Sequence, residues 1–141
     1  MSGTNSGPGD SLTTLKNLVV AVNTLGQYVN GVFNYLRGAV LFSGSAVTAG
    51  HSLLYTVPSG QQMAVVDIEI CNTAAGAATF YISLVPSGGT AGASNALFYA
   101  TTIAANTTTQ WTGQQVLMAG GSVQAYASAT TVTFLVTGGP G

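Results

Sequence analysis

The sequence predicts a mainly β protein, with an N-terminal α-helix of coiled-coil type followed by an antiparallel β-sandwich of the jelly-roll kind. Between residues 11 and 37, apolar residues recur at alternating intervals of three and four, the heptad pattern of a coiled-coil helix. From residue 38 onward, apolar and polar residues alternate in short runs that turn-forming residues separate, as in β-sandwiches. We therefore divide the chain into an N-terminal arm (1–10), an oligomerising helix (11–37) and a sandwich domain (38–141).

Charged residues are scarce in this chain. Asp, Glu, Lys and Arg make up 4% of its 141 residues, against about 25% in an ordinary soluble domain. No Lys or Arg follows Arg37, whereas nucleic-acid surfaces and anionic membranes are bound by clustered basic residues. We therefore expect neither nucleic acid nor a membrane as a partner. A near-neutral polar surface repels neighbouring copies only weakly, which favours a protein packed beside copies of itself, although low charge is also a trait of some habitats and lineages.

The N-terminal arm is rich in Gly, Ser, Pro and Asn, and we expect it to have no fold of its own. It lacks the basic and apolar regions of a secretory signal, so the sequence does not predict export by that route. The helix that follows does not read as a membrane span, because polar residues such as Lys16, Asn23 and Asn30 interrupt its apolar residues.

The helix has clear start and stop signals and an unbroken apolar stripe. Asp10 or Ser11 is suited to cap its first turn, and Gly38 is suited to the left-handed position after its last turn. The stripe occupies heptad positions a and d and consists of Leu15, Leu18, Val22, Leu25, Val29, Val32 and Leu36. A strict 3.5-residue repeat is what supercoiling requires, and apolar residues at the flanking positions, such as Val19 and Phe33, favour more than two helices. We expect a homotrimer; the alternative is an amphipathic helix that packs on its own sandwich.

Period-two alternation is clearest in three runs of the sandwich domain. "MAVVDIEIC" places Val66, Ile68 and Ile70 on one face and Asp67, Glu69 and Cys71 on the other, "TFYISLV" aligns Phe80, Ile82 and Leu84, and "TVTFLV" aligns Val132, Phe134 and Val136. Further strands are expected near residues 39–43, 52–57, 96–103, 107–118 and 122–128. About eight short strands in some 100 residues predict an antiparallel sandwich.

The sequence holds little that resembles an active site. The single His51 and Asp67 would need a nucleophile beside them to form a triad, and no nucleophile-elbow motif is present. Asp67 and Glu69 lie two apart on one strand, a spacing that suits a carboxylate pair for glycoside hydrolysis or the start of a Ca²⁺ site, yet no supporting cluster accompanies them. Cys71 has no second cysteine to pair with and no basic neighbour in sequence. We expect no enzyme activity, no cofactor and no metal.

Aromatic residues are the remaining candidates for a ligand surface. Tyr55, Tyr81, Tyr99, Trp111 and Tyr126 would suit a stacking platform for sugars, with Trp111 and Tyr126 as the candidate glycan contacts. The alternative is that these rings fill the core and the seams between subunits.

Four segments of the sandwich domain, "YTVPSG", "CNTAAGAATFYISLVPSGG", "IAANTTT" and "LMAGGSVQAYAS", resemble in their order the small structural proteins of tailed-bacteriophage virions. The similarity covers nearly the whole chain after residue 12, and its motifs are turns and strands rather than catalytic groups. It implies a virion component of the capsid decoration (cement), head-fibre, or tail-fibre and adaptor type, assembled in the bacterial host cytoplasm.

The resemblance and the heptad stripe together give one hypothesis. Three copies pack through the helix, the sandwich is the knob that the helix presents, and the arm contacts the major capsid protein or a tail or portal-complex protein. The alternative function is a tail-fibre adaptor or a lectin-like module that binds host glycans.

Overall fold

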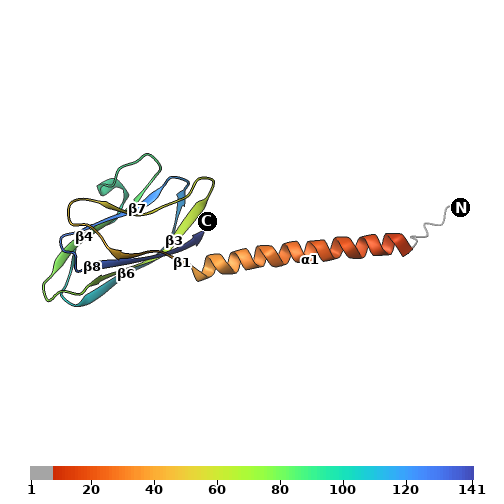
Figure 1. Ribbon diagram of the computed structural model, residues 1–141, viewed down its shortest axis with the longest axis horizontal. Helices are drawn as coiled ribbons and strands as arrows, with labels where there is room; N and C mark the ends of the chain where they lie inside the picture. Colours follow the sequence, from red (N-terminus) through yellow and green to blue (C-terminus); the bar gives the residue numbers. More distant parts are fainter. Residues whose placement is uncertain (1–7) are drawn as a thin grey trace. The chain divides into compact units, whose positions relative to one another are not determined.

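The computed structural model describes the backbone of residues 8–141, and the side chains of residues 11–27 and 38–141. The chain divides into two compact units, Met1–Leu36 and Arg37–Gly141, which are described separately. The first holds one long helix, and the second holds eight strands and a short 3-10 turn (Figure 1). Residues 1–7 of the predicted arm lie outside the described residues.

Helix α1 runs from Pro8 to Arg37, a length of 30 residues. It begins three residues before the predicted start at residue 11, so residues 8–10 belong to the helix and not to the arm. Proline is tolerated in a first helical turn, because the N–H group that it lacks would have no partner there. The helix ends as predicted: Gly38 has a φ of +59°, the left-handed conformation that glycine adopts after a helix.

The second unit contains eight strands, close to the ranges expected from the sequence. They are β1 (Ala39–Ser45), β2 (Ser52–Thr56), β3 (Gln62–Asn72), β4 (Ala78–Val85), β5 (Ala96–Ile103), β6 (Thr107–Met118), β7 (Ser122–Ala127) and β8 (Val132–Pro140), with the 3-10 turn η1 (Ala93–Asn95) before β5. Turn signals in the sequence close the connections. The N–H of Gly89 donates to the carbonyl of Pro86 at 2.9 Å, and that of Gly121 donates to the carbonyl of Met118 at 2.8 Å.

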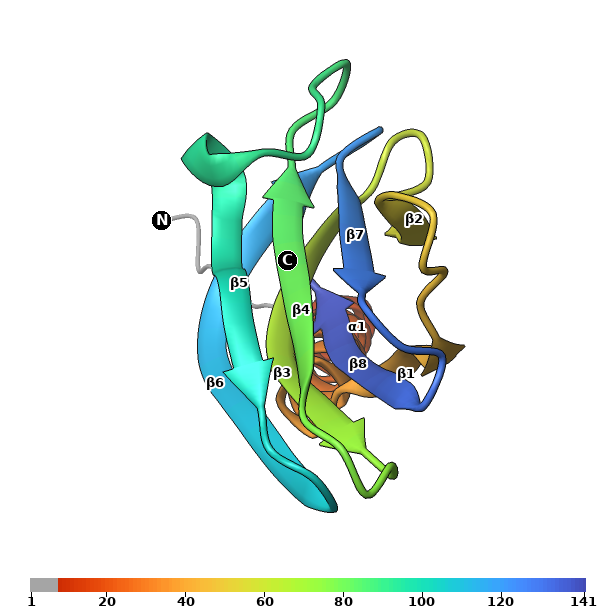
Figure 2. The ribbon, with the colours of Figure 1, turned by 90° about the vertical axis from the view of Figure 1, so that its left-hand side faces the viewer.

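The strands form two four-stranded sheets, in the orders β1-β8-β3-β6 and β2-β7-β4-β5. Every recorded strand pair is antiparallel. Figure 2 shows β5, β4, β7 and β2 side by side in one layer, with the other four strands in the layer behind. Only the β4–β5 connection stays within one sheet, because every other pair of consecutive strands lies in different sheets. The two layers are therefore tied together by most of the connections in the chain.

The core lies between the two sheets and is built from the alternating residues that the sequence pattern identified. Ile68 and Ile70 on β3, Phe80 and Ile82 on β4, and Val132, Phe134 and Val136 on β8 are all at most 1% exposed. Leu84 is half-buried and packs against this cluster. Alternation along a strand sends successive side chains to opposite faces, so the residues between these point away from the core.

The face assigned to Val66 is wrong. A β-bulge between Val65 and Asp67 shifts the register of β3 against both β6 and β8. Val65, which is fully buried, takes the core position, and Val66 is only half-buried. A bulge inserts one residue that the partner strand does not match, so the alternation on its two sides is out of phase.

A buried amide ties three connections of the sandwich together. Asn72, at the end of β3, is fully buried. Its Nδ2 donates to the carbonyls of Gly76 at 2.8 Å and Ala104 at 3.1 Å, and its Oδ1 accepts from the N–H of Ala74 at 3.1 Å and from the hydroxyl of Thr131 at 3.4 Å. Local periodicity assigns Asn72 to the core side of β3, and these bonds explain how a polar side chain is accommodated there.

Candidate functional site

The described part of the apolar stripe is exposed on the helical unit. Leu15, Leu18, Val22 and Leu25 are 57%, 58%, 58% and 61% exposed. The side chains of Val29, Val32 and Leu36, the remaining residues of the predicted stripe, lie outside the described residues. An amphipathic helix normally buries its apolar face. Four large exposed apolar side chains on one face are therefore an unusually large exposed hydrophobic surface.

Three more exposed apolar residues accompany the stripe: Leu12, Val19 and Val20. Leu12 and Val19 share a heptad position and widen the stripe on one side. Val20 falls on the opposite side of the helix, and the heptad pattern did not single it out. The apolar surface of α1 is therefore broader than the a and d positions alone.

The two acidic residues of the sandwich lie on the outer face of the sheet β1-β8-β3-β6. Asp67, Glu69 and Cys71 are all half-buried on β3, on the side opposite Ile68 and Ile70. Asp67 Oδ1 accepts a 2.7 Å hydrogen bond from Nε2 of Gln110 on the neighbouring β6.

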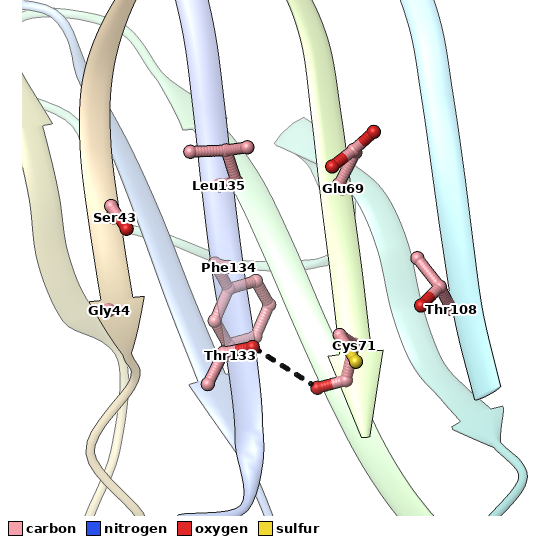
Figure 3. A pocket seen from close by; sticks show the side chains of 8 residues that line it. All are labelled: Ser43, Gly44, Glu69, Cys71, Thr108, Thr133, Phe134 and Leu135. Carbon is pink, nitrogen blue, oxygen red and sulfur yellow. Dashed lines mark hydrogen bonds between the residues drawn. The ribbon is translucent and has the colours of Figure 1, made fainter. Parts of the chain in front are cut away.

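A shallow hollow of about 340 Å³ lies on the same face (Figure 3). Its lining comes from four neighbouring strands and consists of Ser43, Gly44, Glu69, Cys71, Thr108, Thr133, Phe134 and Leu135. The hydroxyl of Thr133 donates to the backbone carbonyl of Cys71 at 3.5 Å. The hollow has one carboxylate and one thiol but no basic side chain, so it lacks the electropositive setting that activates a cysteine.

Four aromatic rings form a continuous row across the other sheet, which we call the ring row: His51, Tyr126, Tyr81 and Tyr99. His51 lies just before β2, and the tyrosines come from β7, β4 and β5, so the row follows the order of the strands. The ring centroids are 6.3 Å apart from His51 to Tyr126, 5.5 Å from Tyr126 to Tyr81 and 5.1 Å from Tyr81 to Tyr99. His51 also contacts Tyr81 edge-on at 5.8 Å.

The ring row lies on the outer face of its sheet. Tyr81 and Tyr126 are directly opposite in the ladder, and both alternate with buried core residues of β4 and β7. Both rings are half-buried, while His51 is exposed and Tyr99 is 61% exposed.

Ser83 lies on the same face of β4 as Tyr81, two residues further along. It is 1% exposed, and its Oγ is the buried side-chain polar atom that has no hydrogen-bond partner among the described residues. A buried hydroxyl in this state carries a cost in free energy, which a buried water molecule would relieve.

Trp111 and Tyr126, which were singled out as candidate glycan contacts, lie on different sheets. Trp111 is on β6, opposite the buried Ile68, where its half-buried ring packs against the core. Tyr55 also packs against the core. Of the five rings considered in the sequence, the fold brings together Tyr81, Tyr99 and Tyr126. It adds His51, which no local pattern connects to them.

The fold does not bring His51 and Asp67 together. His51 contacts Tyr81 and Tyr126 on the outer face of one sheet, and Asp67 lies on the outer face of the other sheet, with the core between them. Within the described residues, no group of three or more His, Cys, Asp or Glu side chains is placed to hold a metal ion. In the same part of the chain, no helix combines the length and apolar character needed to cross a bilayer.

Comparison of the chain with protein-family models, with curated proteins and with solved structures gives no match.

Proposed function

We propose that this chain is a non-enzymatic structural protein of a tailed-bacteriophage virion. It assembles as a homotrimer through α1 and presents the sandwich as a knob on the particle, as a capsid decoration (cement) or head-fibre protein. The major capsid protein is its partner in this arrangement. A place on the tail or portal complex, as a tail-fibre or adaptor part, is the alternative.

The exposed stripe on α1 carries the proposal. Leu15, Leu18, Val22 and Leu25 each expose more than half of their surface on the helical unit. Burying a side chain of this kind completely is worth about 1.5–3 kcal/mol relative to leaving it exposed. An isolated helix cannot bury its own stripe, and the strict 3.5-residue repeat favours other helices as the cover.

We also propose that the sandwich is a jelly roll and that α1 forms a coiled coil. Eight antiparallel strands in two sheets, with orders β1-β8-β3-β6 and β2-β7-β4-β5, support the first assignment. They are what results when a long hairpin of eight strands folds over into two Greek keys, an architecture that viral capsid proteins share with lectins. The heptad stripe supports the second.

The composition and the sequence resemblance also support a structural protein of a virion. Asp67 and Glu69 are the only charged residues of the strands, so the knob has little charge with which to repel copies packed around it. The resemblance to small phage virion proteins runs through β2, β3, β4, β5, β6 and β7, where the shared segments are strands and turns.

The oligomeric state is the first test, measured as the solution mass by light scattering. The full chain is expected to be a trimer, and the double variant Val22→Asp, Val29→Asp is expected to be a monomer, because two carboxylates per chain would be buried in the seam. The matched control is Asn23→Asp, Asn30→Asp, which places the same charges seven residues apart at the next heptad position and should remain trimeric. A parent chain that is monomeric would remove α1 from this role.

The second test concerns the particle. Purified virions of the phage that encodes this chain are expected to contain it, and antibody labelling in the electron microscope is expected to decorate the head. Label on the tail would move the protein to the tail-fibre or adaptor class. Absence of the chain from purified virions would contradict the proposal.

A further inference from the structure

We infer that the outer face of the sheet β2-β7-β4-β5 is a binding surface for an uncharged oligosaccharide, which stacks on the ring row His51–Tyr126–Tyr81–Tyr99. This inference concerns the knob alone and does not depend on whether the protein sits on a phage head or tail. The geometry of the rings, the polar groups beside them and the absence of charge support it.

In the ring row, His51, Tyr126 and Tyr81 are all in mutual contact, and Tyr99 extends the row from Tyr81. The centroid distances are 5.5 Å between Tyr126 and Tyr81 and 5.1 Å between Tyr81 and Tyr99, so the three tyrosines span β7, β4 and β5. Neighbouring planes are steeply inclined, by 58° between Tyr126 and Tyr81 and by 82° between Tyr81 and Tyr99, so the row presents both ring faces and ring edges. Each step is comparable to one sugar unit, and the C–H faces of sugar rings pack on aromatic rings. The ring row therefore offers a surface on which the sugar rings of an oligosaccharide stack.

The tyrosine rings of the ring row are not part of the buried core. Phe80 and Ile82 on β4, which flank Tyr81, are fully buried, so the tyrosine points away from them on the outer side. Tyr99, at the edge strand, exposes 61% of its surface. An exposed tyrosine offers a large rigid surface at a small entropic cost, which is why the residue is frequent at recognition surfaces.

Uncharged polar groups flank the row on both sides. Thr79 and Thr102 face each other across β4 and β5 on one side, and Gln124 on β7 lies on the other. The hydroxyls of Tyr81, Tyr99 and Tyr126 make no hydrogen bond with the described residues. Hydroxyls and amides without charge match the hydroxyl groups of a sugar, and they orient a ligand that the rings hold.

The hydroxyl of Ser83 is a buried polar group close to the ring row. It lies two residues from Tyr81 on the same face, is 1% exposed and lacks a partner within the described chain. Because its oxygen is not exposed, it is suited to a buried water molecule rather than to direct contact with a surface ligand.

The charge pattern selects the class of ligand. None of the four strands β2, β7, β4 and β5 contains Asp, Glu, Lys or Arg. Nucleobases also stack on aromatic rings, but their phosphates need basic side chains, which this sheet lacks. Acidic glycans need the same basic groups. An uncharged oligosaccharide is the ligand whose stacking and hydrogen-bonding groups match this face without leaving a charge unpaired.

The test uses the full chain and an array that carries neutral and acidic oligosaccharides, including linear oligomers of glucose and of N-acetylglucosamine. Binding to neutral members is expected, and the tightest of them is then titrated by calorimetry. Tyr81→Ala and Tyr126→Ala are each expected to weaken binding about tenfold or more, the scale on which loss of one stacked ring acts. Thr133→Ala, on the outer face of the other sheet, is the control and should leave binding unchanged.

Two variants of Tyr99 distinguish the contribution of ring stacking to binding from that of hydrogen bonding. Its exposure makes both substitutions safe for folding, so Tyr99→Ala should weaken binding more than Tyr99→Phe, which keeps the ring. Thermal unfolding of each variant checks that the knob is intact.

Three results would overturn the inference: no neutral oligosaccharide bound at millimolar concentration, binding restricted to acidic oligosaccharides, or binding that Tyr81→Ala and Tyr126→Ala leave unchanged. A fall in solution mass caused by Tyr99→Ala would also overturn it, because the row would then lie between copies of the chain. The mass measured for the stripe variants of α1 is independent of these outcomes, so the two proposals fail separately.

Discussion

Phe80 on β4 and Phe134 on β8 meet edge to face between the two sheets, with ring centroids 6.3 Å apart. Phe80 also contacts Phe98 of β5 at 5.1 Å. The sheets of the sandwich are thus joined at their centre by rings from β4, β5 and β8, in the layer where apolar burial stabilises the fold most.

The first prediction concerns this contact. Phe80→Ala should lower the free energy of unfolding of the sandwich by about 3–5 kcal/mol, because it removes a fully buried ring and leaves a cavity between the sheets. Chemical denaturation followed by near-ultraviolet circular dichroism measures this. Phe80→Leu, which keeps most of the volume, should cost less, and a loss below about 1 kcal/mol for Phe80→Ala would mean that the core collapses into the space.

The second prediction concerns the buried amide of Asn72. Asn72→Ala should cost about 2–4 kcal/mol, because it removes the side-chain partner of the Gly76 carbonyl and of the Ala74 N–H, and one of the two donors to the Ala104 carbonyl. Asn72→Asp should cost more, since the carboxylate cannot donate and would be charged at a fully buried position. Thr107→Ala, which removes an exposed 2.8 Å hydrogen bond to the carbonyl of Ala104, is the control and should cost less than about 1 kcal/mol. Equal losses for Asn72→Ala and Thr107→Ala would contradict the assigned role.

The third prediction compares two glycines. A methyl group at Gly138 on β8 would strike the backbone carbonyl oxygen of Ala64 and lie 2.7 Å from Cδ1 of Leu41, whereas one at Gly76 would meet nothing within 4 Å. Gly138→Ala should therefore destabilise the sandwich by about 1–3 kcal/mol, as overpacking does. Gly76→Ala should be neutral or stabilise it by up to about 1 kcal/mol, because it restricts the unfolded chain. The midpoints of urea denaturation measure both, and a neutral Gly138→Ala would show that β8 and β3 can separate locally.

The fourth prediction concerns α1. Gly26 lies in the helix interior, and a methyl group there would meet nothing within 4 Å in the single chain. Gly26→Ala should raise the thermal stability of the helical unit, since glycine costs about 1 kcal/mol relative to alanine in a helix. Far-ultraviolet circular dichroism at several protein concentrations measures this, and the melting temperature of a trimeric helix should rise with concentration. A lower stability would indicate that a neighbouring chain packs closely against Gly26.

Local sequence patterns predicted the number, type and approximate limits of the elements. Spacings of three and four predicted α1, and alternation predicted which side of β4 and β8 faces the core. These predictions hold because helical and strand periodicities depend on neighbours in the chain. The turn residues worked in the same way, as Pro86 and Gly89 illustrate.

The same local reasoning failed at Val66, where the alternation of β3 changes phase. The bulge between Val65 and Asp67 depends on how β3 pairs with β6 and β8 at once. Nothing in the residues of β3 alone carries that information, because the extra residue is defined only relative to the partner strands.

The sequence by itself determined that the chain is mainly β with one heptad helix. It also showed that charged residues are scarce and that several aromatic residues are present. Only the tertiary structure decided which rings share a surface. It placed Trp111 against the core on one sheet and joined His51 to Tyr81, Tyr99 and Tyr126 on the other. The physical reason is that strand order is set by long-range pairing and by burial of both sheets together, so residues 75 positions apart, such as His51 and Tyr126, become neighbours through contacts that no local period encodes.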